Sequence, residues 1–295
     1  MFSYSNLLEE VQNFCKYGIE TGIVGESELH QAIPYIFVGN KNGKCMIVQG
    51  AIHAREHLTA LLVVNLAKFL VKYNPSMLGG IYFVPMVNPD GVRLCQEGVG
   101  FIEDKQRKSN LLAINRSTDF SLWKANADGV DLNVNFDANW SEGKQNQFYK
   151  GSQNYVGKHP LSAAESRALV EFTQRLNPLV TLSYHLKGEQ IYWDFHQKGL
   201  ARHRDRRYAN MLSAYTGYQL VNSQGSVGGY KDWCIQSLGI PAFTIEVGDD
   251  CYPHPFPYHQ FNTIFQQNKD LPRKLLNTII RDKEQLADAG LADIM

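Results

Sequence analysis

Short apolar runs alternate with longer amphipathic segments along most of this chain, and the alternation limits the folds it can form. The strand-like runs, which are short and mostly apolar, cover 35–38, 46–52, 81–87, 179–184, 190–193 and 242–247. Helical periodicity is found in five segments, at 5–17, 58–73, 162–176, 200–215 and most of 258–286. Strands that alternate with helices predict an α/β fold with a mostly parallel sheet and helices on both faces.

One long stretch, 93–160, departs from this alternation because it is polar, irregular and rich in Gly, Asn and Asp. Loops of this length are usually functional or disordered. The segment Asn88–Gly91 before it reads as a turn, and Ser162 after it is a candidate helix N-cap. The 295 residues contain no repeat and no evident linker, so we expect a single domain over 1–295.

Four of the expected strands end in polar, reactive side chains, namely His53, Asn88, His185 and Glu246. In open α/β sheets, ligands bind outside the carboxyl ends of the strands. We therefore expect these side chains to contribute to a shared site.

A candidate zinc site stands out within this set. His53 and Glu56 are three positions apart, and with His185 they form a His, Glu, His group. Three protein ligands leave one position for water, as in catalytic zinc sites. His57 is a rival ligand at the i, i+4 spacing of HExxH helices, but Ala54 occupies the position where that motif needs Glu. We therefore favour Glu56 and expect His57 to face the helix surface.

Composition argues against several other classes of protein. The net charge is zero, with 29 basic and 29 acidic residues, so neither nucleic acid nor an anionic membrane is an expected partner. The basic run 202–207 is interpreted as a solvated helix face. No apolar run approaches the roughly 20 residues that span a bilayer. No protein partner is inferred.

The N-terminus and the cysteines favour a cytoplasmic location. Residues 1–5 lack the basic and apolar regions of a signal peptide. The five cysteines are odd in number and form no CxxC pair, so reduced thiols, each buried as a small apolar side chain, are expected. A nonstandard export route is the alternative.

Six segments, taken in order, resemble the site segments of the carboxypeptidase A-like zinc peptidase family. They are Gly50–Glu56, Val87–Val92, Gly129–Phe136, Ser183–His185, Gly228–Trp233 and Phe243–Glu246. The resemblance spans 46–250. It implies a mixed eight-stranded sheet flanked by helices, and one Zn²⁺ per chain.

The resemblance also implies roles for individual residues. His53, Glu56 and His185 would bind zinc, and Asp131 would hold the His53 ring, as carboxylates commonly do for ligating histidines. Glu246 would act as general base and acid, Arg55 would hold the oxyanion, and Asn133 would contact substrate. The chemistry is coherent by itself, because a carboxylate outside the ligand set must take the proton of the attacking water. For Glu246 the alternative is a structural salt bridge.

The chain departs from the family pattern at several positions. Val134 stands where digestive members carry the Arg that clamps the terminal α-carboxylate of the substrate, a contact that valine cannot make. The family's second Arg that binds the oxyanion is absent here, and Lys124 is the cation nearest to its position. Gln224 occupies the position of the family's mobile tyrosine. Lys231 falls where the family sets side-chain preference. A cation there suggests a carboxylate-bearing substrate, and an exposed helix lysine is the alternative.

These departures resemble one branch of the family, the bacterial γ-D-glutamyl-diamino acid peptidases. The segments that carry this resemblance are Trp123–Asn126, Val130–Phe136 and His185–Trp193. It implies a zinc peptidase that cuts the bond between D-glutamate and meso-diaminopimelate in small acidic peptides, namely peptidoglycan fragments (muropeptides). The alternatives are a metallocarboxypeptidase on ordinary peptides, an N-acyl amino acid deacylase, and a zinc-binding module without catalysis.

Overall fold

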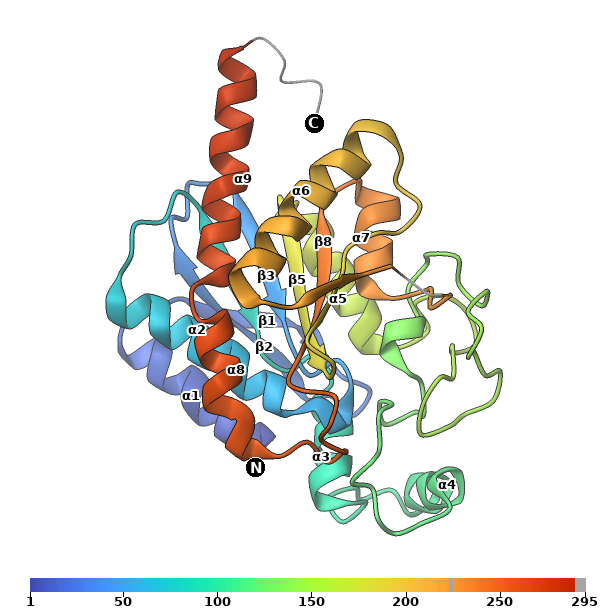
Figure 1. The fold of residues 1–295 in the computed structure, drawn as a ribbon. Helices are drawn as coiled ribbons and strands as arrows, with labels where there is room; N and C mark the ends of the chain where they lie inside the picture. Colours follow the sequence, from blue (N-terminus) through green and yellow to red (C-terminus); the bar gives the residue numbers. More distant parts are fainter. Residues whose placement is uncertain (223–224, 290–295) are drawn as a thin grey trace.

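The computed structural model describes residues 1–222 and 225–289 and contains one eight-stranded sheet (Figure 1). Its strands lie in the order β1-β2-β4-β3-β5-β8-β6-β7. They are β1 (Thr21–Glu26), β2 (Ala32–Gly39), β3 (Cys45–Gln49), β4 (Gly80–Val84), β5 (Val180–Leu186), β6 (Gln190–Tyr192), β7 (Gln219–Val221) and β8 (Ala242–Val247). This arrangement confirms the predicted α/β class and its mixed sheet.

The centre of the sheet is parallel. β4, β3, β5 and β8 pair in parallel, whereas β1, β2 and β6 join antiparallel. The central strands read as continuous apolar runs because both of their faces are buried. The turn between β2 and β3 makes no hairpin, since β4 lies between these two strands.

Helices cover both faces of the sheet (Figure 1). One face packs against α1 (Tyr4–Lys16), α2 (Leu58–Tyr73), α6 (Gly199–Thr216), α8 (Phe261–Asn268) and α9 (Leu271–Asp288). The other packs against α5 (Ala164–Leu176), α7 (Tyr230–Leu238) and part of the long segment 117–160. Along β3 the side chains alternate between the two cores, with Met46 and Val48 in the first and Ile47 in the second.

Several local predictions were wrong. The stretch expected to be irregular contains α4 (Lys105–Asn115), the short 3₁₀ turn η2 (Leu132–Val134) and most of α3 (Pro89–Glu97). Asn88 was expected in a turn but caps the N-terminus of α3, because its Oδ1 accepts a hydrogen bond from the Gly91 amide at 3.0 Å. Ser162 does not cap α5, which begins after Ala163; its hydroxyl accepts from Asn135 at 3.0 Å. β1 and β7 were not predicted.

All eight strands described belong to one sheet, and we propose on this ground that 1–295 forms a single domain. The five cysteines, all within the described residues, are free thiols. Their expected burial holds for Cys234 but is wrong for Cys15 and Cys251, which are exposed. Among the described helices, none has both the length and the apolarity needed to cross a bilayer.

Candidate active site

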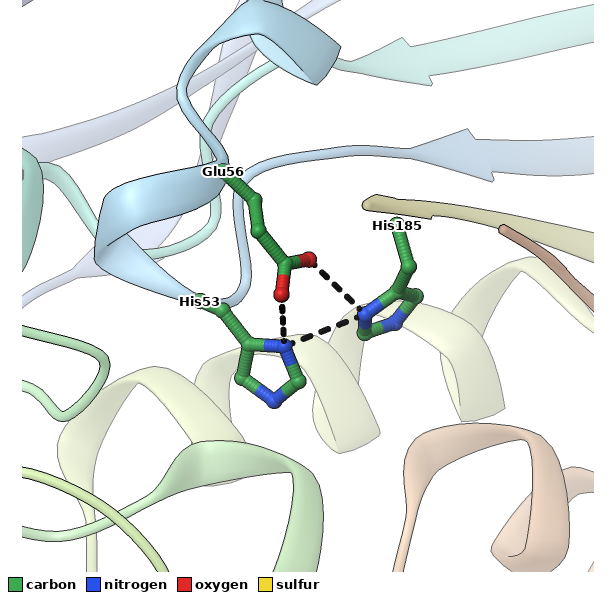
Figure 2. Close-up of side chains that lie close together, drawn as sticks. All are labelled: His53, Glu56 and His185. Carbon is green, nitrogen blue, oxygen red and sulfur yellow. Dashed lines mark hydrogen bonds and ion pairs between the residues drawn. The ribbon is translucent and has the colours of Figure 1, made fainter. Parts of the chain in front are cut away.

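His53, Glu56 and His185 meet at the carboxyl ends of β3 and β5 (Figure 2). Glu56 Oε1 lies 2.9 Å from His53 Nδ1, and its Oε2 lies 3.1 Å from His185 Nδ1. The two Nδ1 atoms are 3.2 Å apart. All three side chains are buried, so the group is a compact set of donors screened from bulk water.

The path of the chain after β3 brings His53 and Glu56 together. Gly50 lies so close to α2 that an added Cβ would meet the Thr59 carbonyl oxygen at 2.9 Å. The Thr59 hydroxyl then bridges two turns of chain, accepting from the Ala51 amide at 2.7 Å and donating to the Glu56 carbonyl at 2.8 Å. The short 3₁₀ turn η1 (Ala54–Glu56) follows, and it presents the side chains of positions 53 and 56 on one side.

The three residues fit a zinc ion. Two imidazole nitrogens and one carboxylate oxygen are typical zinc donors, and three protein donors are typical of a catalytic site. Burial alone would raise the pKa of Glu56, but His53 and His185 outweigh it and hold the pKa well below its usual range. Glu56 is therefore an anion, as a ligand must be.

Asp131 lies behind His53. Its Oδ1 is 3.3 Å from His53 Nε2, and its Oδ2 accepts from the Asn154 amide at 2.9 Å. Lys124 Nζ also lies 2.9 Å from Oδ2. Burial would raise the pKa of Asp131, yet Lys124 and His53 lower it well below the usual value. The carboxylate thus stays ionised and faces the ring nitrogen on the side away from Glu56.

Arg55 and Lys124, the two cations predicted to stabilise the oxyanion, differ in their surroundings. Lys124 is committed to Asp131 through this ion pair. Arg55 Nη1 has two long contacts, 3.4 Å to the Leu122 carbonyl and 3.5 Å to Gln153 Oε1. The Arg55 Nε atom is buried and has no hydrogen-bond partner in the part of the chain described. The Arg55 head group is thus the less firmly held of the two.

Glu246 lies in β8 as the direct sheet neighbour of His185. Its Oε2 is buried without a partner among the described residues, and no ion pair found there includes it. Burial raises its pKa to about 7, although His185, Lys124 and Arg55 oppose the rise. A carboxyl group that titrates near neutral pH can take up and release a proton, which a salt-bridged carboxylate does poorly.

The remaining predicted residues lie at the start of α7 or contact it. Asn133 Oδ1 accepts from the Tyr230 amide at 3.2 Å. Lys231 is 6% exposed, so it is not the exposed helix lysine of the alternative interpretation. Its Nζ donates to the Asp194 carbonyl at 2.9 Å and to Asp232 Oδ1 at 2.5 Å. Gln224 lies outside the described residues.

Two histidines near the site were misjudged or overlooked. His57 does not face the surface: it is buried, its Nδ1 lies 2.6 Å from the Tyr258 hydroxyl, and burial lowers its pKa to about 4. His254 follows β8 and lies near enough to Glu56 and Arg55 for their charges to act on its pKa, which burial lowers. The only signal for His254 in the sequence is its short separation from Glu246.

Asn88, the fourth strand-end residue, braces the site instead of entering it. Its Nδ2 donates to the Ile52 carbonyl at 3.2 Å and to the Ala125 carbonyl at 3.1 Å. It thereby ties the segment that carries His53 to the segment that carries Lys124.

A mixed sheet with a His, Glu, His group at its strand ends defines a class of zinc-dependent hydrolases, and comparison with known proteins identifies the family. The zinc carboxypeptidase family matches residues 4–271, and this chain belongs to that family. It is therefore a zinc metallopeptidase, as the resemblance predicted.

Individual relatives agree with this assignment. The chain is 33% identical over 283 residues to the γ-D-glutamyl-L-diamino acid endopeptidase 1 of Lysinibacillus sphaericus, covering 90% of this chain and 70% of the relative. The fold is similar to bovine thrombin-activatable fibrinolysis inhibitor in complex with tick carboxypeptidase inhibitor, with a TM-score of 0.74, 19% identity, and coverage of 95% and 97%. It is also similar to carboxypeptidase A from Helicoverpa armigera, with a TM-score of 0.72, 16% identity, and coverage of 95% and 72%.

Proposed function

We propose that this metallopeptidase hydrolyses the amide bond between a γ-D-glutamyl group and meso-diaminopimelate in small acidic peptides of the kind released from peptidoglycan. Two findings support this substrate. The Lysinibacillus sphaericus relative is named for cleavage at a γ-D-glutamyl–diamino acid bond. Val134 also offers no cation for a terminal α-carboxylate, so removal of an ordinary C-terminal residue is disfavoured.

The proposed roles follow from the positions of the side chains. His53, Glu56 and His185 hold one zinc ion, which when bound lowers the pKa of a coordinated water and polarises an amide carbonyl. Glu246 takes the proton of the attacking water and passes it to the leaving amine. Asp131 fixes the ring of His53 through Nε2.

Arg55 and Lys124 supply positive charge to the same site. The loosely held Arg55 guanidinium stabilises the oxygen that gains negative charge during attack. The 2.9 Å contact between Lys124 and Asp131 supports a positioning role for Lys124, in addition to the oxyanion contact suggested by its place in the sequence. Asn133 and Lys231 are proposed to contact the substrate beyond the reacting bond.

One observation carries the catalytic assignment. Glu246 is the sheet neighbour of a proposed zinc ligand, has a buried oxygen with no partner among the described residues, and has a pKa of about 7. A zinc-binding module without catalysis would need no such group.

The test replaces Glu246 with Gln. We expect turnover to fall by roughly 10²–10⁴-fold, because the general base is lost, while zinc content stays near one per chain. Glu171→Gln, an exposed substitution on α5, is the matched control and should leave both unchanged. Unchanged turnover in Glu246→Gln would remove Glu246 from the mechanism.

Mass spectrometry of defined muropeptides, ordinary peptides and N-acyl amino acids identifies the substrate. We expect cleavage at the D-glutamyl bond. Release of only plain C-terminal residues would favour an ordinary carboxypeptidase, and release of only acyl groups would favour a deacylase. The five free thiols are compatible with the proposed cytoplasmic location.

A further inference from the structure

Gln190 lies directly beside Glu246 in the sheet. β6 runs antiparallel to β8, and the register pairs these two residues, while His185 is the neighbour of Glu246 on the other side. Paired residues on adjacent strands project from the same face, with Cβ atoms about 4.5–5.5 Å apart. Ile191 and Ile245, the next pair, belong to the core on the opposite face. The Gln190 amide and the Glu246 carboxyl therefore share the face that carries the proposed site.

The hydroxyl of Tyr192 fixes which way the Gln190 amide points. Tyr192 is two residues further along β6, so its ring leaves the same face. Its hydroxyl donates to Gln190 Oε1 at 3.2 Å. Burial raises the pKa of Tyr192 and the charge of Glu246 raises it further, which agrees with a phenol that lies close to this carboxyl. Because Oε1 is bonded to Tyr192, the Nε2 of Gln190 remains as a donor, and it has no acceptor within the described part of the chain.

Substrate can reach this amide. Gln190 and Glu246 are both partly exposed, whereas His53, Glu56 and His185 are buried. The amide is also neutral, which matters next to a general base. A Lys or Arg at position 190 would form an ion pair with Glu246 and tie up the carboxylate that must take a proton. An amide can donate to a substrate oxygen and leave that carboxylate available.

The proposed proton transfer brings the leaving group next to Gln190. Glu246 must come within about 2.6–3.2 Å of the leaving nitrogen to protonate it. The α-carbonyl or α-carboxylate oxygen of the residue that carries this nitrogen lies about 3 Å from it, from standard bond lengths. Such an oxygen falls within reach of the side chain adjacent to Glu246. It also needs a donor, because Val134 supplies no guanidinium for it.

Given the proposed function, on which this inference rests, we infer that Gln190 binds the substrate on the amine side of the cleaved bond. Its Nε2 donates to the α-carbonyl or α-carboxylate oxygen of the residue that carries the leaving amine, and Tyr192 holds the amide in this orientation. Gln190 is thus a substrate-binding residue, and Tyr192, which acts through it, is a positioning residue. The contact is with the oxygen next to the cleaved bond and does not involve the side chain of that residue.

Two peptides that differ only in this oxygen-bearing group test the contact. One is γ-D-glutamyl-meso-diaminopimelate. The other is Nε-(γ-D-glutamyl)-D-lysine, which lacks only the carboxylate next to the cleaved bond and keeps the far end group. For the unmodified protein we expect kcat/KM to be roughly 10- to 100-fold higher for the first peptide, the scale of one hydrogen bond to a charged group.

Substitutions at the two residues then change the ratio of these kcat/KM values. Gln190→Leu removes the donor at similar size, so the ratio should fall to near one. Tyr192→Phe removes only the hydroxyl and lets the amide turn over, so the ratio should fall by roughly 2- to 10-fold, the scale of a neutral hydrogen bond. A ratio of two substrates is independent of the folded fraction, so lost stability does not imitate the effect.

The chain offers a matched control for each substitution. Gln219→Leu is an exposed substitution on β7, at the position that pairs with the other side of Gln190. Tyr35→Phe removes a hydroxyl that contacts Glu20 on the far side of the sheet order. Both controls should keep the full ratio.

The outcomes are distinguishable. A ratio near one in the unmodified protein, an unchanged ratio in Gln190→Leu, or an equal loss on both peptides would overturn the inference and leave the proposed function standing. An equal loss would mean that Gln190 acts on Glu246 or on the sheet and not on the substrate. Failure of the unmodified protein to cleave either peptide would instead reject the proposed function itself.

Discussion

At the residue scale, buried charges at this site are held by specific partners. Asp131 joins His53 to Lys124, and Glu56 joins His53 to His185. Each carboxylate is buried, so it stays ionised only because cationic or hydrogen-bonding neighbours compensate for lost hydration. Removing one partner therefore affects the group that remains.

Asp131→Asn should weaken zinc binding by roughly 10–100-fold, because the His53 ring loses a charged partner and Lys124 loses its counter-ion. Competition with a chromophoric chelator measures the affinity. Asp128→Asn is a suitable control, since the ion pairs of Asp128 are with Arg107, at 3.7 Å, and Lys150, at 3.9 Å, and not with the proposed ligands. Equal zinc affinities in Asp131→Asn and Asp128→Asn would contradict the assigned role.

Glu165, at the start of α5, provides a pH-dependent test. It is fully buried, accepts from Asn126 at 2.9 Å, and burial raises its pKa from 4.5 to about 8. Between these values the unfolded chain is ionised at this residue while the folded protein keeps the proton, so the unfolded state binds fewer protons. The contribution of Glu165 to stability is full below about pH 4.5 and is lost as pH rises toward about 8.

Glu165→Gln removes this titration. Relative to that of the unmodified protein, its free energy of unfolding should become larger from pH 5 to pH 8, by up to about 1.4 kcal/mol per pH unit, so the variant gains relative stability. Denaturant unfolding at three pH values measures the difference. Glu171→Gln, exposed on the same helix, should show none. A pH-independent difference for Glu165→Gln would mean that Glu165 is ionised in the folded protein.

At the element scale, the site depends on how strands end. β3 stops at Gln49, three residues before the end of the predicted run, because Gly50 and Ala51 turn the chain, and Ala51 adopts a φ of 46°. β4 also stops early, and Asn88 then starts α3. His53 thus lies beyond the end of β3, where it meets His185, which lies within β5 itself.

Asn88→Ala removes a helix cap and both bonds that connect the His53 and Lys124 segments. We expect a loss of roughly 2–4 kcal/mol in the free energy of unfolding, together with weaker zinc binding. Asp104→Ala is the matched control, because Asp104 caps α4 through one exposed bond. It should cost about 1 kcal/mol without affecting zinc. Equal effects of both variants on zinc affinity would show that Asn88 acts only as a cap.

At the scale of the whole molecule, the proposed site joins segments that are far apart in the chain. The ligand segment 53–56 follows β3, His185 lies in β5 and the base Glu246 lies in β8. Asp131 comes from the loop region on the α5 and α7 face. A metal ion bound by His53, Glu56 and His185, which these segments bring together, stabilises the folded state over the unfolded chain.

Zinc should therefore raise the melting temperature, by an amount that corresponds to about 2.7 kcal/mol at one hundred times the dissociation constant. Calorimetry with and without a chelator measures the shift. His185→Ala should lose most of the shift because one of the three donors is missing. His203→Ala, an exposed substitution on α6, should retain it. A full shift in His185→Ala would place the metal elsewhere.

The central strands, the longer helices and the types of side chain at the strand ends could be predicted from sequence, because they depend on neighbours a few residues away. β1, β7, α3 and α4 were missed. α2 has the predicted bounds, and His53 and Glu56 were grouped with His185 from their spacing and their places at the ends of predicted strands. The burial of His57 under Tyr258 and the ion pair between Lys124 and Asp131 were decided only by tertiary structure. Each depends on which distant segments pack together, and packing sets the local dielectric and the partners that give a buried charge its pKa.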